Sequence, residues 1–114
     1  MDAKTRLYLL DMLGFANSAT AFLGDADASA LSANPEKFYA VRHAVELVGE
    51  AARRVPEADR KQLPAIAWNE AIGMRNHIAH AYHAVDPVIL VNTIRNHFPG
   101  LVAAIQSALR ELDA

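Results

Sequence analysis

The densest group of chemically reactive side chains lies in residues 74–83, which read MRNHIAHAYH. Arg75 is the only lysine or arginine between Lys61 and Arg95, so its charge does not belong to a general solvated face. An imidazole exchanges protons near neutral pH, and a guanidinium offers phosphate oxygens a planar fork of donors. Together, the arginine and the neighbouring histidines favour chemistry in which a phosphate is held while a proton moves.

A helical wheel for this stretch, at about 100° per residue, gathers most of its polar side chains on one side. The residues that share this arc of roughly 160° are Arg75, Asn76, His80, Tyr82 and His83. Ala79 leaves room above them, and His77 points the other way. Gly73 lies near the same stripe, and a glycine inside a helix costs about 0.5–1 kcal/mol relative to alanine. We therefore expect a polar pocket floor, with Gly73 giving clearance for a backbone or a ligand.

The elements that must position this cluster are all predicted to be helices. Alanine and leucine are abundant, and no alternating strand pattern of any length appears. Asn34-Pro35 and Asp86-Pro87 are helix starts, in which a capping residue precedes a proline at the first helical position. The predicted helices cover about 4–23, 34–54, 67–83 and 88–98, and a last helix follows a break or kink at Pro99-Gly100. The sequence thus predicts one all-α domain over residues 1–114, an antiparallel bundle of about four to five helices.

Two connections and one helix face complete this prediction. Residues 24–33 are expected to form a small-residue loop, and residues 55–64 a linker of mixed charge bounded by prolines. In the first helix, the spacing of Leu7, Leu10 and Leu13 predicts that these leucines face the core. Trp68 is expected to anchor either the core or a dimer interface.

The bulk composition excludes several classes of protein. With 53% apolar residues, the chain of 114 residues is not disordered. It has no cysteine, which rules out disulfides and thiolate zinc sites. No uninterrupted apolar run approaches about 18 residues, and the first residues lack a signal-peptide pattern. A net charge of −2 means that any nucleic acid must bind in a local pocket. We expect a cytoplasmic protein with no membrane partner.

At this point the motif resembles a known group of proteins. Residues 75–82, RNHIAHAY, match the Arg-x4-His-x-Tyr motif of the HEPN superfamily, including the asparagine after the arginine. The upstream segments VGEAA (48–52), LPAIAW (63–68) and GMRN (73–76) look like the HepT branch of ribonuclease toxins. The resemblance covers roughly Phe38 to Ile105. Ala67 stands where a proline often precedes the tryptophan, a departure that affects loop shape and not the motif.

The resemblance implies a fold, an activity and partners. HEPN proteins of this type are all-α homodimers whose motif helices face each other across a groove, and many are endoribonucleases that need no metal. HepT proteins are toxins paired with a minimal nucleotidyltransferase antitoxin. The implied function is therefore the toxin of a type II toxin–antitoxin system that cleaves RNA by attack of a 2′-OH, with no cofactor. In such pairs the motif tyrosine, here Tyr82, is the expected acceptor of AMP.

Residue roles follow from the chemistry that this activity needs. His80 is expected to transfer the proton and Arg75 to neutralise phosphate charge. Asn76 would orient the phosphate or the His80 ring. Glu50 has two open interpretations, as a lining of the groove or as a partner of Arg75. His83 is expected either at the pocket rim or in solvent.

Other interpretations remain open at this stage. Three histidines invite a zinc site, but the i, i+3, i+6 spacing of His77, His80 and His83 spreads them too far around the helix for one ion. His43 and His97 have no companions in the sequence and are expected to be ordinary. The alternative function is a non-catalytic HEPN module that binds a nucleotide or a nucleotidyltransferase partner. A plain helical interaction domain is the third.

Overall fold

The structure, a computed structural model, describes residues 1–81 and 84–114. Its elements in chain order are α1 (Thr5–Leu23), α2 (Ala28–Ser32), α3 (Pro35–Arg54), α4 (Glu57–Gln62), α5 (Trp68–Ala81), α6 (Pro87–Asn92), the π-helical turn η2 (Thr93–His97) and α7 (Phe98–Leu112). No strand occurs in these two ranges. The predicted all-α class is confirmed.

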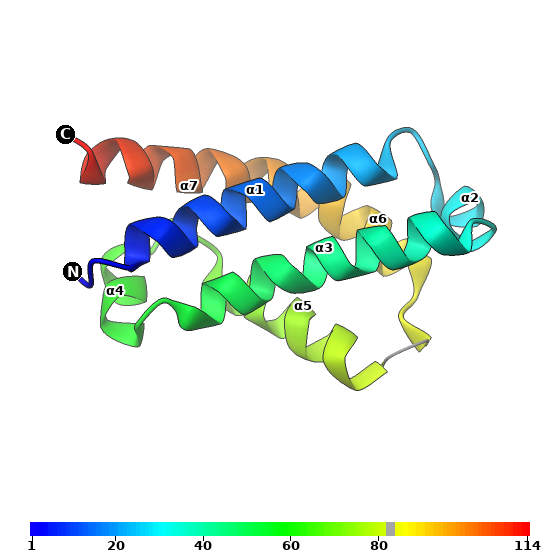
Figure 1. The fold of residues 1–114 in the computed structure, drawn as a ribbon, viewed down its shortest axis with the longest axis horizontal. Coiled ribbons are helices and arrows are strands. Elements are labelled where there is room, and N and C mark those ends of the chain that lie inside the picture. Colours follow the sequence, from blue (N-terminus) through cyan, green and yellow to red (C-terminus); the bar gives the residue numbers. More distant parts are fainter. Residues whose placement is uncertain (82–83) are drawn as a thin grey trace.

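The long helices pack side by side with alternating direction (Figure 1). Helix α1 lies between α3 and α7, and α5 packs on the other side of α3. The core between them is aliphatic; its fully buried large side chains include Leu9, Met12, Val41, Val45, Val48, Leu90 and Ile105. The predicted antiparallel arrangement is therefore present, and α3 is the element that carries α5.

The predicted helix starts are confirmed at both cap-plus-proline sites. Asn34 Oδ1 accepts a hydrogen bond from the backbone N–H of Lys37 at 3.1 Å, and Pro35 begins α3. Asp86 Oδ1 accepts from the N–H of Val88 at 2.9 Å, where α6 begins. Each side chain satisfies an N–H that the first helical turn leaves without a partner.

The predicted core face of α1 is wrong. Leu7 is 54% exposed and Leu10 is 38% exposed, whereas the buried residues of α1 are Thr5, Leu9, Met12, Ala16, Ala19 and Leu23. Helix α1 has apolar residues on more than one side, so spacing alone did not select the side that meets α3. The buried side combines large apolar residues, such as Leu9 and Met12, with the small Ala16 and Ala19.

The two predicted connections each contain a short helix. Residues 24–33 include α2, which Asp27 caps by accepting from the N–H of Ala30 at 2.8 Å. The linker includes α4, which is attached to α1 through its buried residue Asp59. The Asp59 carboxylate accepts from Thr5 Oγ1 at 2.5 Å and from the N–H of Asp2 at 2.9 Å. Neither short helix has an apolar stripe long enough for periodicity to reveal it.

The predicted break at Pro99-Gly100 is also wrong, because the helix continues through both residues into α7. The irregularity comes just before them, in η2, where the N–H of Phe98 bonds to the carbonyl of Thr93, five residues back. Proline is tolerated here because it occupies the first turn of α7.

The continuous helical stretch Pro87–Leu112 is the one segment of the described chain that is long and apolar enough to cross a membrane by length and composition. This is weak evidence, since core helices of soluble proteins meet the same criterion. Its buried residues recur every three or four positions, as on an amphipathic helix: Leu90, Ile94, Phe98, Leu101, Ile105 and Leu109. The absence of a membrane partner stays a prediction.

Candidate functional site

The site is positioned by a close crossing of α3 and α5 at Gly49. A Cβ atom added to Gly49 would collide with Arg75 Cβ and with the carbonyl oxygen of Ala71, so only glycine fits there. No backbone uses the predicted clearance at Gly73, since a Cβ there would meet no described atom within 4 Å, and its role as clearance for a ligand stays a prediction. The close approach occurs at a different glycine, on the neighbouring helix. Gly49, beside Glu50 on α3, is the residue that lets Arg75 come against that helix.

Two side chains hold the Arg75 guanidinium at this crossing. Its Nε donates to Glu50 Oε2 at 2.9 Å, and its Nη1 donates to Asn76 Oδ1 at 3.1 Å. The side chains of Arg75 and Glu50 are only 24% and 28% exposed, so the contact between them is partly shielded from water. Among the described residues, Nη2 makes no hydrogen bond. The guanidinium is thus fixed along one edge and keeps donors for a ligand.

Glu50 is therefore a partner of Arg75, one of the two interpretations that the sequence left open. Its Oε2 also lies 3.7 Å from Arg53 Nη1. Two guanidiniums flank one carboxylate, so the three side chains carry a positive charge together. Such a cluster attracts an anion while its internal pairing keeps the arginines in place.

His80 lies one turn further along α5 and is exposed. Its Nδ1 is 2.7 Å from the backbone carbonyl oxygen of Asn76. A carbonyl oxygen can only accept, so Nδ1 carries the hydrogen, and the neutral ring keeps its lone pair on Nε2. Asn76 thus links the two groups: its side chain orients Arg75 and its carbonyl orients His80. The ring is prepared to accept a proton at Nε2.

Of the remaining predicted residues, two are not described by the structure and one lies in the core. Tyr82 and His83 lie outside the described residues. Trp68 begins α5 and is buried at 7% exposure, with its Nε1 donating to the carbonyl of Leu63 at 3.0 Å, so it anchors the core. Over residues 1–81 and 84–114, no group of three His, Cys, Asp or Glu side chains could hold a metal ion.

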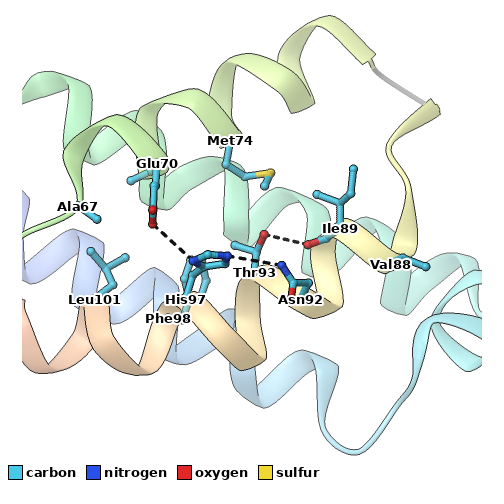
Figure 2. A pocket seen from close by; sticks show the side chains of 11 residues that line it. Ala67, Glu70, Met74, Val88, Ile89, Asn92, Thr93, His97, Phe98 and Leu101 are labelled. Atoms are coloured by element: carbon cyan, nitrogen blue, oxygen red, sulfur yellow. Dashed lines mark hydrogen bonds and ion pairs between the residues drawn. The ribbon is translucent and has the colours of Figure 1, made fainter.

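A cavity lies on the other flank of α5, between it and α6, η2 and α7 (Figure 2). Its volume is about 410 Å³, and its walls are mainly apolar, including Met74, Ile89 and Leu101. Glu70 and His97 meet across it, with His97 Nδ1 3.4 Å from Glu70 Oε2. His97 Nε2 is 3.4 Å from Asn92 Nδ2 on the adjoining turn.

His97 was expected to be ordinary, and it is an exposed residue of η2. Its partner Glu70 lies 27 positions earlier in the chain, and no short-range pattern reveals such a pair. π-helical turns are frequent at functional sites.

Comparison with known proteins gives matches that extend over most of the chain. A family profile described as "Ribonuclease HepT-like" matches residues 12–108. "Putative RNase MJ1380" of Methanocaldococcus jannaschii is 31% identical over 105 residues, which cover 92% of this chain and 94% of that protein. "Probable ribonuclease HepT" of Thermococcus cleftensis is 36% identical over 63 residues, covering 55% of this chain and 57% of that protein. No solved structure matches the chain.

Proposed function

The chain belongs to the HepT-like ribonuclease family of the HEPN superfamily, and from that premise we propose that it is a metal-independent endoribonuclease, the toxin of a type II toxin–antitoxin pair. One observation carries the proposal. The carbonyl of Asn76 holds Nδ1–H of His80 while the side chain of Asn76 holds Arg75, so a base and a phosphate clamp share one support.

The reaction follows from these two groups. His80 Nε2 removes the proton from a ribose 2′-OH, and O2′ attacks the adjacent phosphorus. The bond from phosphorus to the 5′ oxygen breaks, and that oxygen takes a proton. Arg75 donates from its Nη atoms to the phosphate oxygens, where negative charge builds up. The products are a 2′,3′-cyclic phosphate and a free 5′-OH.

We propose that two copies form the working enzyme. The departing 5′ oxygen needs a proton donor, and a second His80, protonated, supplies one if a twofold dimer places both motif helices along one groove. The exposed position of His80 leaves it accessible to a second protomer. Light scattering at micromolar concentration tests this: we expect the mass of a dimer, and a stable monomer would contradict it.

We propose that a minimal nucleotidyltransferase antitoxin silences the enzyme in the cytoplasm by attaching AMP to Tyr82. The phosphate would bring negative charge close to the Arg75 face and repel an incoming RNA phosphate. Intact-mass spectrometry after co-expression should show added AMP, and Tyr82→Phe should remove it. An unchanged mass with Tyr82→Phe still neutralised would mean that the antitoxin acts by binding alone.

The decisive experiment is cleavage of purified total RNA by the full chain in EDTA. We expect cleavage by the wild type and a loss of about 100-fold or more in His80→Ala, because general base catalysis contributes roughly that factor. His77→Ala is the matched control, an exposed histidine of the same helix on another side, and should remain active.

Two results would overturn the proposal. Cleavage that disappears in EDTA and returns with a metal ion would contradict the metal-independent mechanism. No cleavage by a folded dimer would favour the non-catalytic module that binds a nucleotide or a nucleotidyltransferase.

A further inference from the structure

A second pocket lies where α3 begins. The pocket there has a volume of about 280 Å³, close to the lower end of the roughly 300–1,000 Å³ of small-ligand sites. Its lining residues are Ser32, Pro35, Phe38, Tyr39, Val85 and Pro87. Two of them, Val85 and Pro87, belong to the segment that leads into α6.

The wall of this pocket contains an exposed, supported aromatic ring. Tyr39 is 50% exposed, and its ring packs edge-on against Phe38 at a centroid distance of 6.0 Å. The guanidinium of Arg42 lies 5.2 Å from the centroid of the Tyr39 ring. An aromatic ring beside a guanidinium is the arrangement on which unpaired nucleobases stack in proteins that bind single-stranded RNA.

Helix geometry aligns this ring with the proposed catalytic groups. At about 100° per residue, one arc of α3 about 100° wide contains Tyr39, Arg42, Glu46, Gly49, Glu50 and Arg53. Gly49 and Glu50 are the residues that meet Arg75. Arg42 lies about 10 Å along the axis from Gly49. Because α3 and α5 run antiparallel (Figure 1), this direction on α3 leads toward the end of α5 that carries His80.

The charges along this arc suit a nucleic acid backbone. Along α3, Arg42 precedes and Arg53 follows Gly49 and Glu50, the two residues that contact Arg75. Of the two carboxylates of the same arc, Glu50 is paired with Arg75 and Arg53, and Glu46 Oε1 lies 3.5 Å from His43 Nδ1. Three guanidiniums (Arg42, Arg53 and Arg75) thus outnumber the two carboxylates, and the net positive charge attracts a phosphate chain.

We propose that the pocket at Tyr39 is a base-stacking subsite for single-stranded RNA, which takes one unpaired nucleobase of the bound strand, about 15 Å along α3 from the Arg75 contact. The proposal rests on the proposed ribonuclease function and adds its substrate class. Stacking accepts any base, so this subsite selects unpaired strands over duplexes with little preference for sequence.

The test measures RNA binding apart from cleavage. The probe is a fluorescein-labelled single-stranded oligoribonucleotide with 2′-O-methyl groups at every position, which cannot be cleaved, and fluorescence anisotropy gives its Kd. We expect Tyr39→Ala to raise the Kd about 5- to 100-fold, the range for loss of one stacked base. Tyr39→Phe keeps the ring and should bind like the wild type. Phe22→Ala is the matched control, since Phe22 is an aromatic residue of α1 with 48% exposure.

A second readout separates stacking from a structural role. Single abasic positions are moved along the same oligonucleotide. In the wild type, one abasic position should weaken binding as much as Tyr39→Ala does, and in Tyr39→Ala that position should have no further effect. If abasic positions act equally in both proteins, no base stacks on Tyr39 and the proposal is wrong.

The outcomes distinguish this subsite from the proposed function. Binding that depends on Tyr39, without cleavage by the wild type, would support the subsite and refute the ribonuclease. Cleavage with a Kd that Tyr39→Ala does not change would refute the subsite alone. A Tyr39→Ala protein that becomes monomeric by light scattering would make Tyr39 a contact between protein chains, which also refutes the subsite.

Discussion

The two flanks of α5 offer a ligand different kinds of contact, polar on one flank and mainly apolar on the other. On one flank, Arg75 packs against Gly49 of α3 and is held by Glu50 and Asn76. On the other, Met74 lines a cavity of about 410 Å³ shared with α6, η2 and α7. The first flank has several polar atoms fixed by hydrogen bonds, and the second has a cavity with mainly apolar walls.

This contrast indicates that the volume of a cavity and the presence of reactive side chains are separate properties of the fold. Reaction at a phosphate needs donors and a base that are fixed in position by hydrogen bonds. A cavity lined by Val88, Ile89 and Leu101 offers burial of apolar surface, which favours binding and not proton transfer. The volume of a cavity is thus a poor guide to the reactive groups of this chain.

The largest expected effect compares neighbouring residues on the two flanks. Arg75→Ala should lower the single-turnover rate of RNA cleavage about 100- to 1,000-fold, the usual cost of losing a donor to developing charge. Met74→Ala, one position earlier and facing the cavity, should stay within about threefold, since it removes no polar group. Similar losses in both variants, with thermal unfolding unchanged, would mean that the cavity belongs to the reactive site.

The helix crossing itself gives the next largest effect. Gly49→Ala should lower the free energy of unfolding by about 1–3 kcal/mol, because its methyl group meets backbone of α5 that cannot move alone. Gly73→Ala has open space and should stabilise the protein by up to about 1 kcal/mol through better helix propensity. Urea unfolding followed by circular dichroism measures both, and equal effects would contradict the close crossing.

A smaller effect is expected from the carboxylate behind Arg75. Glu50→Gln keeps an oxygen that can accept from Arg75 Nε but removes the charge, and a partly exposed pair contributes about 1 kcal/mol or less. We expect cleavage to slow by roughly threefold to fivefold. Glu70→Gln makes the same change on the cavity flank and should leave the rate unaltered.

The smallest effect concerns the pair across the cavity. His97→Ala breaks an exposed contact with Glu70 and should change the free energy of unfolding by no more than about 0.5 kcal/mol, as for most surface substitutions. Cleavage should remain within about twofold. A rate loss as large as that of His80→Ala would reverse the assignment of the two flanks.

A separate prediction concerns acid stability at α4. The hydrogen bond from Thr5 holds the pKa of Asp59 below its usual value, despite the opposing effect of burial. A carboxyl whose pKa is lowered by folding stabilises the protein above its unfolded pKa, and this stabilisation is lost as the pH falls through the lower, folded value. Asp59→Asn should therefore flatten the decline of melting temperature between about pH 5 and pH 2, as calorimetry over that range would measure.

The sequence predicted those parts of the fold that depend on local chemistry. Asn34 and Asp86 marked helix starts because a cap acts within three residues. It placed Arg75 and His80 on one helix because their spacing is local. The sequence could not select the buried face of α1, or identify Gly49 as the glycine at a close helix crossing. Both depend on which helices pack against each other in the folded protein. The pairing of Glu70 with His97 likewise depends on tertiary packing.

The π-helical turn η2 has a consequence for comparing relatives of this chain. A π turn contains one residue more than an α turn, so removing that residue returns a plain helix without rotating the segments on either side. Relatives without η2 are then expected to align with this chain through a single-residue gap between Thr93 and His97. Such a gap inside a helix is easily taken for an alignment error, whereas here it would record the loss of the turn that carries His97.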